Sequence, residues 1–204
     1  YYKNRYTKNP KNFQQFQKNW LKRKPKVFWR GSSTGEIILN TTNDLFHLKR
    51  VILCKQFNNK NFNLKISKIV QNTLPKQIFI AELKKQNLWS RPVFEIKFSD
   101  YCFYPDIPGN ALAWGSIRKY LMGNLIFKPY TERKLYYYQF IKPWKHFIPV
   151  ENDFSDLYEK YKWAISHMED SSLIAWNGYI QANNYIKVLP EIFISILIEK
   201  NQND

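Results

Sequence analysis

Residues 27–35 read Val27-Phe28-Trp29-Arg30-Gly31-Ser32-Ser33-Thr34-Gly35. The first three residues form a short β-prone run, and the glycines and hydroxyls that follow are typical of a flexible loop. The same order recurs later, where a strand over residues 101–104 leads into a turn over residues 106–110 that contains Pro, Gly and Asn. These two strand-to-loop transitions indicate the fold class, because repeated strand, loop and helix units predict an α/β protein.

The rest of the chain extends this alternation. We expect a helix from Asn43 or Asp44 with Leu45, Leu48, Val51 and Ile52 on its apolar side. Further helices are expected over residues 111–122, which Gly123 ends, and over residues 132–140. The last two begin at Asp153 or Ser155 and at Ser171 or Ser172, and the final one is expected to carry Leu173, Trp176 and Ile180 on its apolar side. Strands are expected over residues 125–127 and 146–150. Residues 58–98 give no firm assignment. The pattern predicts a Rossmann-like parallel sheet covered on both faces.

Chain length and local composition suggest one folded unit with two flanking segments. We interpret residues 1–26, which are polar and basic, as a linker or the remnant of an upstream lobe, and residues 27–188 as the folded domain. Residues 189–204 are expected to form a C-terminal helix and tail. Their apolar run, residues 192–198, is much shorter than the roughly twenty residues that span a bilayer.

The net charge of +16 over 204 residues points to an anionic partner. Nucleic acid, an acidic membrane face and a phosphorylated substrate are all compatible with it. A drift toward Lys, Asn, Ile and Tyr, typical of AT-rich genomes, explains the bias about equally well. Cys54 and Cys102 each lie in an apolar run, which predicts buried free thiols in a reducing compartment. The Cys and His residues lack metal-ligand spacing, so no metal site is expected.

Both loops after the expected strands are candidate anion sites, because α/β sheets bind ligands outside the carboxyl ends of their strands. The first contains a cation, two glycines and three hydroxyls, and the second, residues 108–114, brings small residues to the start of a helix. Neither is a GxxxxGK[ST] phosphate loop or a GxGxxG dinucleotide turn.

Three blocks together resemble glycosyltransferase family 90, which includes capsule- and lipopolysaccharide-modifying enzymes and protein O-glucosyltransferases. Residues 28–35 resemble the family's aromatic-Arg-Gly-Ser-x-Thr signature. Residues 109–114 with residues 121–127 are similar to its second block, a Gly-Asn turn, a helix and a strand. Residues 142–150 with the segment after Asp153 resemble the third. The resemblance covers residues 27–180 in the family's order.

This resemblance implies the donor-binding lobe of a GT-B glycosyltransferase. Carried over by position, the residues against the nucleotide diphosphate would be Arg30, Gly31, Ser32 and Thr34. The uridine and ribose would be held by Gly109, Asn110, Ala111, Leu112, Ala113 and Trp114. Arg50 is the best match to a further basic residue of the family, with Lys49 as the alternative. An Arg binds phosphate oxygens bidentately, which agrees with this placement.

The chain departs from the family pattern at two points. Some members carry an Arg where this chain has Gly115, and Arg118 is one helical turn further on. The family's catalytic carboxylate belongs to the upstream lobe, and no residue here matches it, so the catalytic residue is unknown. We interpret His146 as a structural imidazole, and Trp144 and residues 136–138 as aromatics of the core and lobe contacts.

The expected function is transfer of a hexose from a nucleotide-sugar donor, a UDP-sugar, to a saccharide or lipid-linked acceptor in bacterial lipopolysaccharide or capsule synthesis. No cofactor is expected beyond the donor. The basic surplus would hold the enzyme at the inner, cytoplasmic face of an anionic membrane. The alternative is a basic nucleic-acid-binding module. It lacks support, because the chain contains no RNP, zinc-finger or helix-turn-helix pattern, so nucleic acid is not an expected partner.

Overall fold

The computed structural model describes residues 10–110, 115–131 and 136–202, with side chains up to residue 188. Five parallel strands form one sheet in the order β2-β1-β3-β4-β5. They are β1 (Lys24–Ser32), β2 (Phe62–Lys68), β3 (Tyr101–Pro105), β4 (Leu125–Pro129) and β5 (Ile148–Val150). The predicted α/β fold with a Rossmann-like parallel sheet is confirmed.

Burial along the strands explains why some were readable from the sequence. Every residue of β3 and β4 is buried, and central parallel strands, covered on both faces, read as continuous apolar runs. The edge strand β2 instead alternates buried and partly exposed positions within an Asn- and Lys-rich stretch. This strand lies in residues 58–98, which could not be assigned from the sequence because its outward positions are polar.

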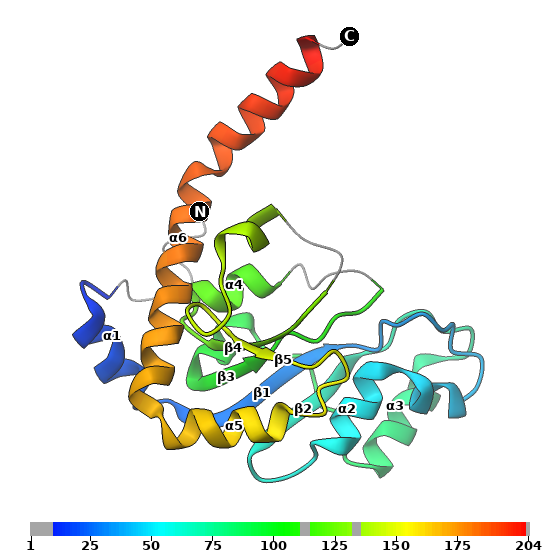
Figure 1. Ribbon diagram of the computed structural model, residues 1–204. Coiled ribbons are helices and arrows are strands. Elements are labelled where there is room, and N and C mark those ends of the chain that lie inside the picture. Colours follow the sequence, from blue (N-terminus) through cyan, green and yellow to red (C-terminus); the bar gives the residue numbers. More distant parts are fainter. Residues whose placement is uncertain (1–9, 111–114, 132–135, 203–204) are drawn as a thin grey trace.

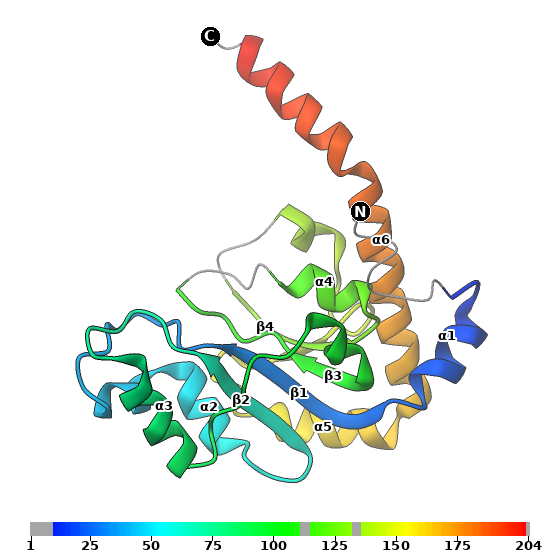
Figure 2. The same cartoon turned by 180° about the vertical axis from the view of Figure 1, so that it is seen from behind.

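Helices surround the sheet. They are α1 (Phe13–Trp20), η1 (Asn43–His47), α2 (Lys49–Gln56), α3 (Lys76–Lys85), η2 (Glu95–Asp100), α4 (Ser116–Leu121), η3 (Tyr136–Phe140), α5 (Leu157–Ser166) and α6 (Met168–Gln202). In Figures 1 and 2, α2 and α3 lie together at one end of the molecule, and α6 runs along the other end and projects beyond the body. No described helix is both long and apolar enough to cross a membrane.

The amino-terminal segment is part of the same folded unit. Trp20 in α1 is fully buried and donates its indole N–H to the Gly123 carbonyl, 2.9 Å away. Phe16 packs on Trp176 of α6, with ring centres 5.2 Å apart. The expected domain start at residue 27 therefore differs from the observed arrangement, in which β1 already begins at Lys24. At the other end, α6 continues without a break through the expected boundary after residue 188.

Two predicted helices differ in detail from the observed ones. The helix expected from Asn43 is interrupted at Leu48, whose backbone is extended, and so becomes η1 followed by α2. Leu45, Leu48 and Val51 are buried as expected, but Ile52 was assigned to the apolar side wrongly, because it is 46% exposed. The break at Leu48 rotates α2 relative to η1, which moves Ile52 outward.

The last helix begins earlier than expected and buries a different face. It starts at Met168, and Leu173 and Ile180 point outward, whereas Ala175 and Tyr179 are buried. Close packing by small residues explains the difference: Ser171 and Gly178 lie on the inner face, and a Cβ on Gly178 would come within 2.7 Å of the His146 carbonyl oxygen. Hydrophobicity alone does not indicate a face that is built from Ser, Gly and Ala.

The turn after α4 matches the prediction that Gly123 ends the helix. Gly123 has φ +71°, a conformation that favours glycine. Its N–H donates to Tyr120 O and the N–H of Asn124 donates to Lys119 O, the pair of bonds that defines a Schellman cap. Of the helix expected over residues 111–122, residues 111–114 lie outside the described residues. The helix expected over residues 132–140 is a short 3-10 turn in its described part, η3.

Candidate functional site

The strand order places the two candidate loops side by side. Along the chain, β1 is followed by β2 on one side of it, whereas β3 is followed by β4 on the other side. The order therefore reverses between β1 and β3, and such a point in a doubly wound sheet leaves a crevice at the carboxyl ends of the strands. The loops that follow Ser32 and Pro105 meet there.

Arg50 joins these two loops. It is the second residue of α2, and its Nε donates to Pro108 O at 3.0 Å, while its Nη2 donates to Ile107 O at 3.1 Å. Its Nη1 donates to the carbonyl and the hydroxyl oxygen of Ser32, at 3.1 and 3.2 Å. The guanidinium is thus fixed at the switch point by atoms from both loops.

The hydrogen-bond partners of the Arg50 guanidinium given above are neutral carbonyl and hydroxyl oxygens. No salt bridge to Arg50 occurs within the described part of the chain. Burial lowers its pKa from the usual value, and Tyr104 and Asp106 act in the opposite direction. An arginine stays protonated in proteins, so a partly buried positive charge remains, and none of the described carboxylates pairs with it. Such a charge favours an anionic ligand in the crevice.

Ser32, Thr34 and Gly109 lie around the guanidinium. The Ser32 and Thr34 hydroxyl oxygens are 2.5 Å apart. A Cβ on Gly109 would lie 3.0 Å from both Arg50 Nη2 and Thr34 Cγ2. Without a side chain at Gly109, no Cβ covers Arg50 Nη2 from that side, and guanidinium N–H donors bind phosphate oxygens.

Gly31 allows the Trp29 ring to pack close to the Arg50 guanidinium. A Cβ at Gly31 would approach the Trp29 ring to 2.2 Å, so this position accommodates only glycine beside the buried indole. The Arg50 guanidinium carbon in turn lies 5.5 Å from the centre of the Trp29 ring. Trp29 is thus a packing surface under Arg50, and Gly31 allows it to lie there.

Arg30 is not part of this cluster. Side chains alternate along a strand, so Arg30 projects to the opposite face from Trp29 and Gly31. Its Nη1 donates to Trp29 O and Asn63 O, both at 2.7 Å, and its Nη2 donates to Asn63 Oδ1 at 2.8 Å. The guanidinium also lies over the Phe28 ring, 4.4 Å from its centre. These bonds make Arg30 a link between β1 and β2.

The remaining predicted positions are the rest of the second loop, Lys49 and Arg118. Asn110 follows Gly109 in the second loop and is exposed, whereas Ala111, Leu112, Ala113 and Trp114 lie outside the described residues. Lys49, the alternative to Arg50, donates instead to Asn152 O and lies over the Phe154 ring. Arg118 reaches Gly115, where a Cβ would lie 3.5 Å from its Nη2, but its Nε is 3.0 Å from Glu95 Oε1.

A buried ion pair that was not predicted from the sequence lies beside the second loop. Asp106 follows β3 directly, and its Oδ2 is 2.9 Å from Lys128 Nζ at the carboxyl end of β4. The Ser116 hydroxyl donates to the other Asp106 oxygen. Both charged residues are almost fully buried. The signal was an Asp directly after an apolar strand, but its partner lies 22 residues away, a distance that sequence patterns do not relate.

Cysteine and histidine provide no metal site in the parts of the chain that are described. No group of three or more His, Cys, Asp or Glu residues there could hold a metal ion. Cys54 and Cys102 are buried free thiols, as predicted. His146 is buried and its Nδ1 accepts the N–H of Lys142 at 2.8 Å, in agreement with the interpretation as a structural imidazole.

The strand order and the bonds of Arg50 together define an α/β domain with a cationic side chain at its topological switch point. Comparison with known families identifies the group of proteins: the model of glycosyl transferase family 90 matches residues 5–189. This chain belongs to glycosyl transferase family 90. The resemblance seen in the three sequence blocks is thereby confirmed at the level of the family.

Individual relatives are distant. The chain is 23% identical to protein O-glucosyltransferase 3 of Mus musculus over 169 residues, which cover 83% of this chain and 30% of the relative. It is 22% identical to uncharacterized protein 179R of Invertebrate iridescent virus 6, covering 93% of this chain and 18% of that protein. The chain therefore spans less than a third of these curated relatives.

Among solved structures, one similar chain is the C-terminal domain of a glycosyl transferase group 1 family protein from Francisella tularensis. The superposition covers 85% of this chain and 92% of that domain, with 12% identity and a TM-score of 0.46. The fold assignment rests on the strand order of the chain itself.

Proposed function

We propose that this chain is the donor-binding lobe of a GT-B glycosyltransferase that transfers a hexose from a UDP-linked donor. Family membership supports transferase chemistry in general. The observation that carries the donor assignment is Arg50, a cation fixed by both switch-point loops with no ion pair among the described residues. A diphosphate would accept hydrogen bonds from Nη2 beside Gly109 and from the hydroxyls of Ser32 and Thr34.

In the proposed reaction the bond between the anomeric carbon and the diphosphate oxygen breaks, and the acceptor hydroxyl oxygen forms the new bond to that carbon. The acceptor proton passes to a general base. Arg50 would stabilise the negative charge that develops on the leaving diphosphate. We propose that the base belongs to another part of the protein, since the chain spans only a fraction of its relatives.

Two acceptor classes follow from different observations. The sequence resemblance includes lipopolysaccharide- and capsule-modifying enzymes, which implies a bacterial saccharide acceptor. The murine relative is named for O-glucosylation of protein, which favours a hydroxyl of a protein side chain. The curated relatives described above come from an animal and a virus, so we give the protein acceptor priority. Donor-dependent labelling of a protein extract and of a lipopolysaccharide preparation by the whole enzyme would separate them.

A nucleotide titration tests the donor site. Melting temperatures are measured with UDP, UMP, UDP-glucose and inorganic pyrophosphate. A ligand at about 100 times its Kd stabilises the folded state by about 2.7 kcal/mol, so diphosphates should raise the melting temperature measurably. We expect UDP to stabilise more than UMP, and Arg91→Ala, which changes an exposed arginine of a loop, to respond as the wild type does. Absence of any diphosphate effect would contradict the proposal.

The nucleic-acid alternative is not favoured by family membership, and it predicts a different outcome in solution. A nucleic-acid module would bind oligonucleotides with an affinity that falls steeply as salt rises, and would not respond to UDP. A donor lobe would show the reverse selectivity.

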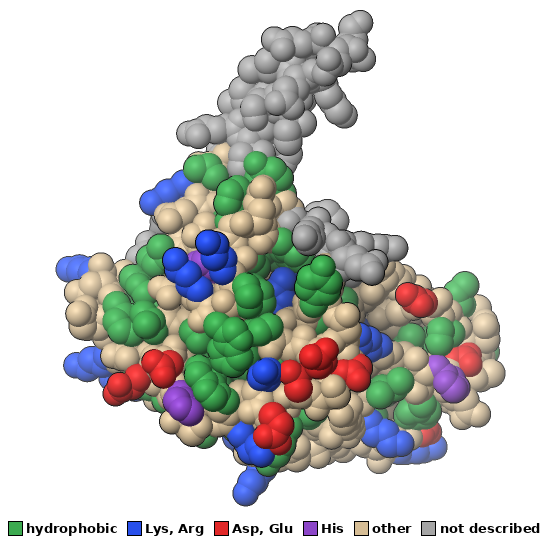
Figure 3. All heavy atoms as spheres, viewed as in Figure 1, with side chains coloured by type: hydrophobic (Ala, Val, Ile, Leu, Met, Phe, Trp, Pro, Cys, Tyr) green, Lys and Arg blue, Asp and Glu red, His purple; other side chains and the backbone are tan. Residues whose placement is uncertain are grey.

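Association with an anionic membrane at its cytoplasmic face is a further proposal, based on the net charge of +16. The face in Figure 3 carries acidic and basic side chains side by side, so it is not a uniformly basic surface. Exposed lysines do gather where α1 meets β1, at Lys22, Lys24 and Lys26. Each cation near an anionic surface contributes about 1 kcal/mol. Sedimentation with phosphatidylserine vesicles, but not with phosphatidylcholine vesicles, is the expected result, and a triple Lys→Glu variant at these positions should stay in the supernatant.

A further inference from the structure

A concave site lies at the carboxyl ends of β4 and β5. Its volume is about 590 Å³, within the range of roughly 300 to 1,000 Å³ that is typical of small-molecule sites. We call it the aromatic hollow. Its walls are mainly tyrosine and proline, among them Pro129, Tyr130, Tyr136, Tyr138, Pro143 and Pro149.

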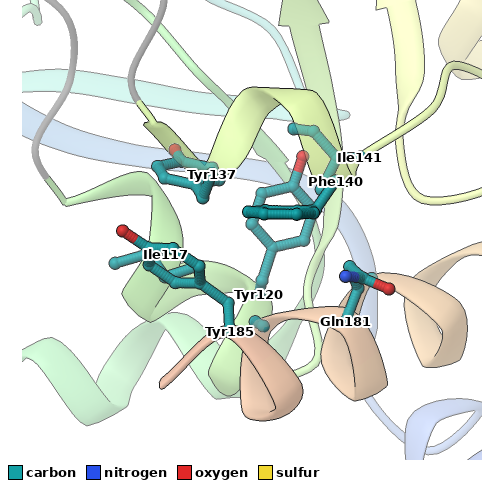
Figure 4. A pocket seen from close by; sticks show the side chains of 9 residues that line it. Ile117, Tyr120, Tyr137, Phe140, Ile141, Gln181 and Tyr185 are labelled. Atoms are coloured by element: carbon teal, nitrogen blue, oxygen red, sulfur yellow. The ribbon is translucent and has the colours of Figure 1, made fainter. Parts of the chain in front are cut away.

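Contacts of η3 with α4 and α6 position the tyrosines of the hollow that η3 carries. Figure 4 shows the contact between η3, α4 and α6, in which Tyr137 and Phe140 face Tyr120 and Tyr185. Tyr137 is buried there, with its ring centre 5.7 Å from that of Tyr185. Because this contact anchors η3, Tyr136 and Tyr138 on either side of Tyr137 are fixed in the wall of the hollow.

The described walls of the hollow have little net charge to offer an anion. Lys128 is the charged side chain among its described lining residues, and its Nζ lies 2.9 Å from Asp106 Oδ2 and 3.6 Å from the centre of the Tyr138 ring. The carboxylate neutralises the ammonium, in contrast to Arg50 in the neighbouring crevice. A neutral ligand with an apolar face and polar edges is therefore the complementary chemistry.

A pyranose ring has this character. Its axial C–H bonds form apolar faces that pack on aromatic rings, and its hydroxyls lie at the rim, where Gln139 and the tyrosine hydroxyls of the hollow are available. Tyr130, which is 69% exposed, presents such a ring at the mouth. We propose that the aromatic hollow binds a neutral pyranose. The proposal rests on the proposed function in that the sugar would lie beside a nucleotide site.

The two sites are physically connected. Asp106, which pairs with Lys128 of the hollow, directly precedes Ile107, whose carbonyl oxygen accepts a hydrogen bond from Arg50. A sugar in the hollow and a diphosphate at Arg50 would therefore lie on either side of one short segment. This is the relationship that a donor hexose or an acceptor saccharide needs to the leaving group.

The test is a titration of the protein with methyl β-D-glucopyranoside, followed by NMR and calorimetry, in the wild type, Tyr130→Ala, Tyr130→Phe and Phe94→Ala. We expect saccharide binding with a Kd on the order of millimolar, as is usual for so small a ligand. Tyr130→Ala should weaken it by about fivefold, because the stacking ring is lost, and Tyr130→Phe should preserve it. Phe94→Ala, which removes another exposed aromatic ring, 89% exposed, is the matched control and should bind as the wild type does.

UDP titrations of the same proteins separate this proposal from the proposed function. If UDP binds and Tyr130→Ala leaves its affinity unchanged, the nucleotide site is intact and the saccharide result concerns the hollow alone. Competition of the glucoside with UDP-glucose, but not with UDP, assigns the hollow to the donor hexose, and simultaneous binding with UDP-glucose assigns it to an acceptor. No saccharide binding, equal binding to Tyr130→Ala, or competition with UDP itself would overturn the proposal.

Discussion

Arg50 Nε donates a hydrogen bond to Pro108 O across 3.0 Å and so joins the helix after β1 to the loop after β3. The bond crosses the switch point of the sheet, where the strand order reverses. Because the other guanidinium nitrogens bind Ser32 and Ile107, the position of this one side chain depends on the conformation of both loops. Changes in either loop should therefore alter anion binding through Arg50.

Gly109→Ala should weaken UDP binding with little loss of stability. The added Cβ would lie 3.0 Å from Arg50 Nη2, on the side from which a phosphate would approach. Loss of a hydrogen bond to a charged group corresponds to roughly tenfold or more in affinity. Gly115→Ala is the control, since its Cβ would meet an atom at the end of the flexible Arg118 side chain at 3.5 Å. Equal UDP affinities of the two variants in calorimetry would show that Gly109 does not face the ligand.

Asp106→Asn should destabilise the fold strongly. It leaves the ammonium of Lys128 buried without a counter-charge, and removal of one partner of a buried ion pair typically costs about 3 to 5 kcal/mol. The double variant Asp106→Asn with Lys128→Met should recover part of that loss, because no buried charge remains. Urea denaturation measures the free energies of unfolding. Glu82→Gln, which breaks the surface pair of Glu82 with Lys85, should leave the midpoint unchanged, and a similar null result for Asp106→Asn would exclude the buried pair as a stabilising element.

His146 should make stability fall in mild acid. Burial lowers its pKa from the usual value, with Lys145 and Lys142 acting in the same direction. The unfolded chain therefore binds a proton more readily than the folded protein does. The stability from the neutral imidazole is present above the unfolded pKa of about 6.5 and is lost as pH falls toward the lower folded pKa.

The measurement for His146 is the drop in melting temperature between about pH 7.5 and about pH 5.5. His146→Asn places an amide oxygen where Nδ1 accepts the N–H of Lys142, and it does not titrate. The drop should be smaller in this variant than in the wild type. An identical drop in both proteins would assign the acid sensitivity to other groups.

Cys54 and Cys102 should be unreactive in the folded protein. Burial raises the pKa of each thiol to about 12, so almost no thiolate is present at neutral pH. Ellman's reagent should modify neither thiol until the chain is unfolded in guanidinium chloride, after which both react. Fast modification under native conditions would mean that one of these segments opens readily.

The sequence predicted those parts of the fold whose pattern is local. The apolar runs of β3 and β4 and the stop at Gly123 depend on neighbouring residues, and they lie where they were expected. The strand β2 was not assigned, because an edge strand with polar outward positions lacks a continuous apolar run. The inner face of α6 was misjudged because it is built from small residues that pack closely.

In the candidate site, too, features that depend on local sequence were predicted and features that depend on distant residues were not. Ser32, Thr34, Gly109 and Arg50 were predicted from loop composition and family resemblance, and the structure brings them together. The orientation of Arg30 was not predictable from the loop motif, because it depends on Asn63 in the unassigned strand. The pair of Asp106 with Lys128 needs the adjacency of β3 and β4, which only the sheet order supplies.

The roles of Arg30 and Arg50 can be compared directly. Arg30→Lys and Arg50→Lys each keep the charge and lose the planar fork, and both proteins are first checked for folding by their melting temperatures. Arg30→Lys should melt earlier than the wild type without ligand, since its bonds to Asn63 are lost. Its affinity for UDP should stay within about twofold of the wild type, because a residue remote from the ligand contributes little to binding.

Calorimetric titration of UDP into the folded Arg50→Lys and Arg30→Lys proteins tests whether the anion site is built on Arg50. We predict that Arg50→Lys raises the Kd for UDP by at least about tenfold, the scale for loss of a charge-assisted hydrogen bond, while Arg30→Lys does not. Unchanged UDP affinity in Arg50→Lys, together with a large loss in Arg30→Lys, would contradict the account and place the diphosphate on the other face of β1.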